Sequence, residues 1–396
     1  MIRQWLIMVV VLAVGAAAAY YLHDETGYVL VSFHGWILET SLLGLILAVG
    51  LTVVGTWLLL RLIIGGVQLP AALRGMAERR RRDRAQRSFE TGTLHLLEGD
   101  WKRAEVELVR RAADHHAGHL NYLSAARAAQ RMGAGERRDH YLHLATSVAP
   151  ALERATLLTQ ARLQLERGEF TLARDVALRL RALEPKHLLS VELQAEALFG
   201  LADWEALRQL LVSDIGAAGV PAPRRREMLA RALVARLREA AAEARLDQVK
   251  AIWGDTPNDA RQWPEVRLQY ARSLARLNAQ PEALAVVSAV LNREWDGGLA
   301  TLHGELEPAD SVGQLAALEQ WLNRYGERTE LLMAAGRVCL RNRLWGKARS
   351  YLDAVERIAP SAAVYLELAK VCEQSQNPTE AQTFYRRGLE QAANGR

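Results

Sequence analysis

The sequence has only two cysteines in 396 residues, which excludes a disulfide framework and a cysteine-based zinc site. Aromatic residues make up just 6% of the chain, and runs of valine and isoleucine are scarce after residue 70. Alanine, leucine and arginine dominate instead, and these residues lose little free energy on entering a helix. The composition therefore predicts a helical protein.

Catalytic motifs are also missing. No phosphate-binding loop, nucleophile elbow, HExxH motif or pair of catalytic carboxylates is present. Gly133 and Gly135 begin a GxG pattern, but Arg138 replaces the third glycine of a dinucleotide fingerprint and no strand precedes it. We therefore predict a protein that is not an enzyme and has no catalytic residue, no metal site and no obligatory cofactor.

Two apolar runs lie near the N-terminus, at about 5–22 and 42–64, and each is long enough to cross a bilayer of roughly 30 Å. The segment between them is acidic, whereas an arginine block follows the second run and includes Arg79, Arg80, Arg81 and Arg82. Because positive charge stays on the cytoplasmic side, we predict a multi-pass membrane protein with both termini and the large domain after the arginine block in the cytoplasm, and with the short acidic loop on the opposite side.

Each of these features has an alternative explanation. The first run, with its four consecutive alanines, also resembles a cleaved signal peptide, which would leave the orientation of the large domain unchanged. The arginine block is best explained as a topology determinant, and contact with anionic lipids is compatible with that role. A nucleic-acid site is disfavoured so close to a bilayer, so the net charge of +5 does not indicate a nucleic-acid partner.

From residue 88 the sequence repeats. Small residues recur 12 positions apart, as expected where the two helices of a 34-residue tetratricopeptide unit approach closely. The pairs are Gly92/Ala104, Ala161/Ala173, Ala271/Ala283, Gly336/Ala348 and Ala369/Ala381, with a weaker copy at Ala195/Leu207 and an irregular one at Ala126/Arg138. Pro185 and Pro360 stand where a unit should close.

The predicted fold is therefore all-α, a transmembrane hairpin followed by a tetratricopeptide-repeat solenoid. We assign residues 1–70 to the hairpin, 71–87 to a basic juxtamembrane segment, 88–215 to an N-terminal repeat block, 216–310 to degenerate repeats and joints, and 311–396 to a C-terminal block.

The residue after each small site on the first helix of a unit is expected to face the concave groove, and most of these residues are basic. The predicted groove cations are Arg127, Arg131, Arg162, Arg272, Arg276, Arg337, Arg341 and Lys370. Guanidinium groups grip carboxylates in a bidentate manner, so the pattern suits an anionic ligand such as an acidic peptide or a porphyrin. The alternative is an ordinary solvated face in an arginine-rich protein.

Histidines cluster in one predicted repeat and its neighbour, with His116/His119 and His140/His143 spaced to share a helix face. Such pairs are candidate haem-iron ligands. Solvated histidines near helix ends are the more common case, and no cysteine or acidic pattern completes a site. Cys339 and Cys372 occupy equivalent positions in successive units, which favours buried packing residues over a redox pair.

Several segments resemble the proteobacterial HemY family: GYVLVSFHGWILETS (27–41), RRRRDRAQRSFETGTLHLLEGDWKRAE (79–105), NYLSAARAAQRMG (121–133), ALEQWL (317–322) and RVCLRNRLWGKARSYLDA (337–354). The resemblance covers nearly the whole chain and is weakest over 215–265. It implies an inner-membrane protein associated with late protohaem synthesis. The name is shared with a flavin-dependent oxidase whose dinucleotide fingerprint is absent here.

Three functions follow from these observations. The first is a scaffold that gathers haem-pathway enzymes or tetrapyrrole intermediates at the membrane through protein–protein interactions. The second is a general adaptor for envelope assembly or quality control. The third is a direct haem or porphyrin carrier or sensor.

Overall fold

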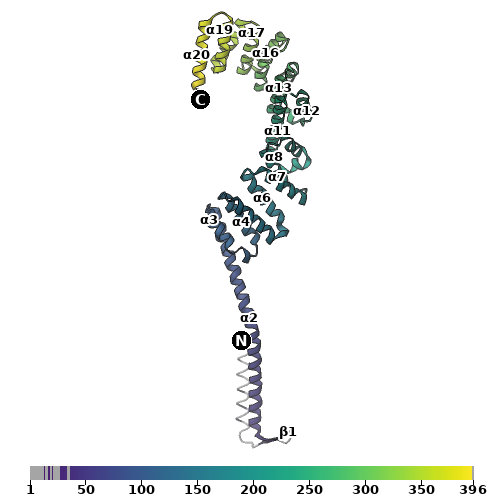
Figure 1. Ribbon diagram of the computed structural model, residues 1–396, viewed down its shortest axis with the longest axis vertical. Coiled ribbons are helices and arrows are strands. Elements are labelled where there is room, and N and C mark those ends of the chain that lie inside the picture. Colours follow the sequence, from purple (N-terminus) through teal and green to yellow (C-terminus); the bar gives the residue numbers. More distant parts are fainter. Residues whose placement is uncertain (1–12, 14–16, 18–19, 21–26, 34–35, 395–396) are drawn as a thin grey trace. The chain divides into compact units, whose positions relative to one another are not determined.

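The computed structural model describes residues 13, 17, 20, 27–33 and 36–394, with the backbone alone at 33, 36, 43, 61–75 and 394. The first predicted span, 5–22, therefore lies almost entirely outside the described residues. Over the part of the chain that the structure describes, no helix combines the length and the apolar character needed to cross a bilayer. The described residues fold almost entirely as helices (Figure 1).

The chain divides into two compact units, Met1–Val148 and Ala149–Arg396. The described elements of the first unit are two strands, four α-helices and one short 3-10 helix. They are β1 (Tyr28–Phe33), β2 (Trp36–Ser41), α2 (Leu42–Glu98), α3 (Trp101–Arg110), η1 (Ala112–Asp114), α4 (Gly118–Arg131) and α5 (Gly135–Val148).

The two short strands are an exception to the predicted all-α fold, which the rest of the described chain confirms. β1 and β2 pair antiparallel, with Val31 opposite Leu38, and Phe33 and Trp36 close the hairpin. Valine, isoleucine, phenylalanine and tryptophan favour strands, and a histidine and a glycine, residues 34 and 35, connect β1 to β2. Both faces of this short segment carry apolar residues, so the sequence did not mark it as a pair of strands. The prediction of helices holds from residue 42 onward.

Helix α2 is continuous from Leu42 to Glu98. It therefore contains the second predicted span, the arginine block and the first helix of the first repeat, which the sequence analysis assigned to three different segments. The helix begins where the Ser41 hydroxyl accepts a hydrogen bond from the backbone nitrogen of Gly44, 3.2 Å away. It ends at Gly99, whose φ of 82° favours glycine.

The predicted close approach between the two helices of a repeat is confirmed at its glycines. A Cβ atom on Gly92 would lie 2.7 Å from Cγ of Leu108, and one on Gly336 would lie 2.7 Å from Cγ of Leu352. In both repeats the contacting leucine lies one helical turn beyond the predicted partner, which is Ala104 in the first case and Ala348 in the second. Both of these alanines are completely buried, so the small residues do mark the interface.

The second unit consists of helices that follow one another as antiparallel pairs. Its α-helices are α6 (Glu153–Glu166), α7 (Phe170–Leu183), α8 (Leu188–Gly200), α9 (Trp204–Val212), α10 (Asp214–Gly219), α11 (Ala222–Ala242), α12 (Leu246–Gly254), α13 (Pro264–Arg276), α14 (Gln280–Leu291), α15 (Gly297–Glu305), α16 (Ser311–Tyr325), α17 (Thr329–Arg341), α18 (Trp345–Ile358), α19 (Ala362–Gln374) and α20 (Pro378–Asn394). Two 3-10 turns, η2 (Pro150–Leu152) and η3 (Ala260–Gln262), complete the described elements.

Turn residues set the helix boundaries. Asp203 accepts a hydrogen bond from the backbone nitrogen of Ala206 at the start of α9, and Asp100 does the same for Arg103 at the start of α3. Helices α7 and α18 end before Pro185 and Pro360, respectively.

One apolar core extends from Val191 to Phe384 without interruption. It includes buried residues of α11, α13 and α15, so the segment predicted as degenerate repeats and joints contributes to the same core. Trp253 stacks on Tyr270, with ring centroids 4.1 Å apart and planes parallel to within 1°, and packs against this core. The predicted boundaries at 215/216 and 310/311 stay predictions.

Candidate functional site

The predicted groove cations differ in their contacts. Four of them are exposed and make no hydrogen bond or ion pair with any residue that the structure describes. These are Arg127 on α4, Arg162 on α6, and Arg272 and Arg276 on α13. Each follows or lies one turn beyond a buried alanine of its helix, as the repeat register predicts. Their guanidinium groups are free to bind an external anion.

Two predicted cations are instead neutralised inside the fold. Arg337 donates from Nε to Oε1 of Glu367 at 3.0 Å, and Lys370 donates from Nζ to Oε2 of the same carboxylate at 3.2 Å. The Glu367 side chain is only 9% exposed, so the carboxylate requires these cations to offset the cost of its burial. Arg337 and Lys370 thus balance a buried charge.

Arg341 has a structural contact as well. Its Nη1 donates to the carbonyl oxygen of Gly304 at 2.8 Å, and its Nη2 donates to that of Leu306, also at 2.8 Å. These carbonyls end helix α15, where they have no partners within the helix. Burial lowers the pKa of Arg341. This side chain therefore caps α15. Arg131 at the end of α4 is exposed and lies over the Trp101 ring, 5.9 Å from its centroid.

The four candidate haem ligands lie in the first unit. His119 lies on α4, and His140 and His143 lie on α5, but His116 precedes α4, so the prediction that His116 and His119 share a helix face is wrong. His116, His140 and His143 are exposed, and His119 is half-buried. No group of three or more histidine, cysteine or acidic residues is positioned to hold a metal ion within the described part of the chain.

The neighbouring His115 is buried and has the better-defined contacts. Its Nδ1 lies 2.5 Å from Oδ1 of Asn121, and its Nε2 lies 2.9 Å from Oε1 of Gln86. The ring also stacks on Phe89 at 4.9 Å. His115 thereby joins α2 to α4. No sequence pattern distinguishes His115 from the exposed histidines around it.

Ion pairs between neighbouring repeats are a feature that sequence reasoning missed. Arg137 contacts Glu105 at 2.9 Å, Lys250 contacts Glu282 at 2.7 Å, and Lys347 contacts Glu319 at 3.1 Å. Their sequence separations are 32, 32 and 28 residues, close to one repeat length. Each pair therefore connects equivalent regions of successive repeats.

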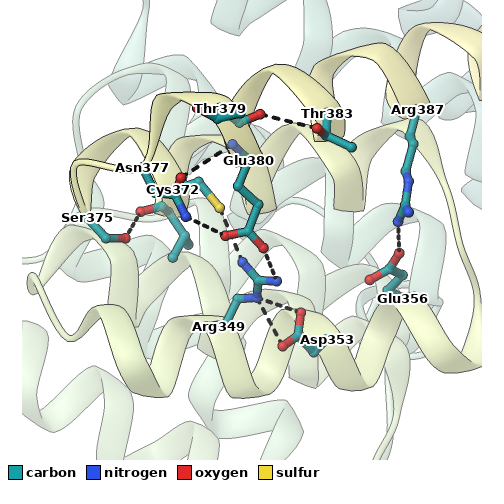
Figure 2. Close-up of polar contacts among 11 residues, drawn as sticks. Arg349, Asp353, Glu356, Cys372, Ser375, Asn377, Thr379, Glu380, Thr383 and Arg387 are labelled. Carbon is teal, nitrogen blue, oxygen red and sulfur yellow. Dashed lines mark hydrogen bonds and ion pairs between the residues drawn. The ribbon is translucent and has the colours of Figure 1, made fainter.

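A polar cluster surrounds Arg349 (Figure 2). Its guanidinium donates to Oε1 of Glu380 at 2.7 Å, to the Asp353 carboxylate at 2.9 Å, and to Sγ of Cys372 at 3.2 Å. The hydrogen bond from Arg349 lowers the pKa of Glu380, and burial raises the pKa of the Cys372 thiol. As predicted, Cys339 and Cys372 are both buried.

A pocket of about 460 Å³ lies in the second unit, lined by the first residues of α9 and by α11 and α12. Asp203, Glu205, Glu239 and Glu243 give it an acidic lining, and Trp204 contributes an aromatic wall. Arg236 projects from α11 and contacts Glu205. No predicted groove cation lines this pocket.

Comparison with known proteins gives the same family as the sequence motifs. Residues 27–133 match the family model described as the HemY protein N-terminus. Over 390 residues the chain is 27% identical to Protein HemY of Escherichia coli K12, covering 97% of this chain and 96% of the relative. Protein HemY of Shigella flexneri matches to the same extent.

Among solved structures, a tetratricopeptide repeat protein from Parabacteroides merdae covers 73% of this chain and 99% of its own, at 15% identity and a TM-score of 0.34. The tetratricopeptide domain of P58(IPK) covers 77% and 92%, respectively, at 15% identity and a TM-score of 0.24.

Proposed function

We propose, because the chain belongs to the HemY family, that it is a membrane-attached repeat scaffold associated with late protohaem synthesis. Repeat proteins of this kind bind partners through long surfaces that stacked helices create. The exposed, unpaired arginines Arg127, Arg162, Arg272 and Arg276 support this proposal. Such side chains suit an acidic segment of a pathway enzyme or the propionates of a tetrapyrrole.

Attachment to the bacterial inner membrane is supported by the first half of α2. Its side chains between residues 46 and 60 are mostly apolar and exposed on every side of the helix. A helix that is apolar all round requires an apolar environment, either a large protein core or a bilayer. We take the bilayer as that environment and place the segment 42–64 in it, with 5–22 as the second span.

The cytoplasmic orientation of the repeats is supported by the arginine block. Arg79, Arg80, Arg81 and Arg82 are exposed, and none of them pairs with a residue that the structure describes. Because four successive helical positions point in four directions, these charges surround α2. Unpaired arginines beside a span favour the cytoplasmic side.

A deletion strain and an affinity purification together test the proposed function. Porphyrin should accumulate in the strain, and haem-pathway enzymes should copurify with the full chain from crosslinked, detergent-solubilised membranes. Normal porphyrin levels combined with envelope defects would instead indicate an adaptor unrelated to haem. Visible absorbance on titration with haem, lost in variants of His116, His119, His140 and His143, would indicate a carrier.

A further inference from the structure

The β1–β2 hairpin carries exposed apolar side chains that no described part of the chain covers. Val31 is 46% exposed and Leu38 is 62% exposed. The hairpin has a single charged residue among its strand positions, Glu39. A two-stranded hairpin of this kind is marginally stable in water by itself, so it requires a surface that covers it.

The two faces of the hairpin differ in composition. Residues directly opposite in the register share a face, and alternate residues along a strand lie on opposite faces. Among the side chains that the structure describes, one face therefore carries Val29, Val31, Leu38 and Thr40, and the other carries Tyr28, Leu30, Ser32, Ile37, Glu39 and Ser41. We name the first the apolar face and the second the mixed face.

The connection to α2 fixes the hairpin at the end of that helix. β2 ends at Ser41 and α2 begins at Leu42 without a linker, and the Leu42 nitrogen donates to the carbonyl oxygen of Gly27 at 2.9 Å. β1 extends across the end of α2 and not along it (Figure 1). When α2 crosses a bilayer, the hairpin therefore lies in the plane of the membrane surface.

The hydrogen-bonding groups of the backbone determine how deeply the hairpin can lie in the membrane. In a two-stranded sheet each strand has one open edge, whose N–H and C=O groups require water or a polar partner. The hydrocarbon core cannot satisfy them, which excludes deep burial. The apolar side chains disfavour bulk water. The interfacial layer satisfies both requirements, and aromatic residues are enriched there.

We propose that the β1–β2 hairpin binds the lipid interface on the side of the membrane opposite the repeats, with its apolar face towards the acyl chains. The inference rests on the proposed membrane attachment of α2. It assigns β1 and β2 to lipid contact, and this contact holds the first residues of α2 at the membrane surface.

Spin labels on the full chain in phosphatidylethanolamine/phosphatidylglycerol vesicles test the proposal. Val31→Cys places a label on the apolar face and Ser32→Cys places one on the mixed face. The native cysteines are 0% and 2% exposed, so the unsubstituted chain serves as the labelling control. Leu58→Cys in α2 is the lipid reference, and Ser147→Cys on α5 is the water reference.

Collision of each label with oxygen and with a water-soluble nickel chelate is then measured. We expect the oxygen-to-nickel ratio at position 31 to match that at position 58, and the ratio at position 32 to match that at position 147. A water-like ratio at 31 alongside a lipid-like ratio at 58 overturns the hairpin assignment alone. A water-like ratio at 58 overturns the membrane attachment itself. Dipolar broadening at 31 shows that a second copy covers the hairpin, which also overturns the proposal.

Discussion

Arg349 on α18 and Glu380 on α20 form an ion pair in which Nη2 and Oε1 are 2.7 Å apart, although 31 residues separate them in the sequence (Figure 2). The same guanidinium lies over the Phe384 ring, 5.0 Å from its centroid. Arg349 therefore connects α18 to the final helix through both charge and packing. The contact stabilises α20 against the helix pair that precedes it.

Replacing Arg349 with methionine should loosen α20 while keeping most of the apolar stem in place. We expect the free energy that holds α20 in the folded state to fall by only about 1 kcal/mol, because the ion pair is partly exposed and solvent screens it. Faster amide hydrogen exchange in α20 would measure the effect. Arg386→Met is the matched control, since its bond to Glu390 lies within one exposed helix and contributes only a few tenths of a kcal/mol. Equal exchange rates in both variants would contradict the assigned role.

The same contact predicts a response to acid. Because the hydrogen bond from Arg349 lowers the pKa of Glu380, the folded state holds this carboxylate ionised more strongly than the unfolded state does. The resulting stability is present above the unfolded pKa of about 4.3 and is lost as the pH falls through the lower folded value. The protection of α20 amides relative to their intrinsic exchange rate should therefore fall below about pH 4.3 in the native chain, and the Arg349→Met variant should lack this component.

His303 predicts a second pH dependence with a different range. The side chain is 1% exposed, packs edge-on against Trp321 at 4.8 Å, and has no partner for Nδ1. Burial, followed by the charge of Arg341, lowers the pKa of His303 to about 4. The unfolded state, with a pKa of about 6.5, therefore binds the proton first as the pH falls, so acidification destabilises the fold.

From these values we expect the free energy of unfolding of the second unit to fall by roughly 2 kcal/mol between pH 7 and pH 5. Urea denaturation, followed by a probe in the second unit, measures this change. His303→Phe keeps an aromatic ring and should remove most of this difference. His143→Phe, at an exposed histidine in the first unit, should leave it unchanged. An unaltered pH profile in His303→Phe would show that the imidazole is not the responsible group.

Two glycines provide a matched test of repeat packing. Gly336→Ala introduces a Cβ atom 2.7 Å from Leu352, so the leucine or the helix must move, at a cost of about 1–3 kcal/mol. Gly346→Ala adds the same atom to α18 where nothing lies within 4 Å, and higher helix propensity should stabilise it by up to about 1 kcal/mol. Thermal unfolding should shift in opposite directions for the two variants. A shift in the same direction would contradict the close approach at Gly336.

The sequence was sufficient to predict the helices, the buried small residues and the turns, because each depends on residues within one repeat. Asp100 and Asp203 cap their helices as their positions predict, and Ala161, Ala271 and Ala369 are completely buried. These features arise from local propensity and from a spacing that recurs along the chain.

The contacts that distinguish one cation from another could not be predicted in this way. Arg272 and Arg337 occupy equivalent repeat positions, yet only Arg337 faces a carboxylate on the next first helix, Glu367. Such pairs depend on which long side chains meet between neighbouring repeats. The hairpin was missed for another reason: both of its faces carry apolar residues, so the alternation that normally marks a strand is weak.

The unpaired arginines of α13 allow the binding surface itself to be tested. Arg272 and Arg276 lie one turn apart, so their exposed guanidinium groups form one patch of positive charge on that helix. Reversing both charges with Arg272→Glu and Arg276→Glu should weaken a bound acidic partner by about tenfold or more, since opposed charges become like charges across the contact. The amount of copurified partner measures this loss.

The matched controls separate surface charge from folding. Arg293→Glu reverses an exposed, unpaired charge outside the predicted groove and should leave copurification unchanged. Arg337→Glu places a like charge beside the buried Glu367, so it should lower the thermal stability before it affects any partner. Because exposed charges are screened within about 8 Å at physiological ionic strength, added salt should release the partner from the native chain. Copurification that withstands both salt and the double reversal would place the binding surface elsewhere on the repeats.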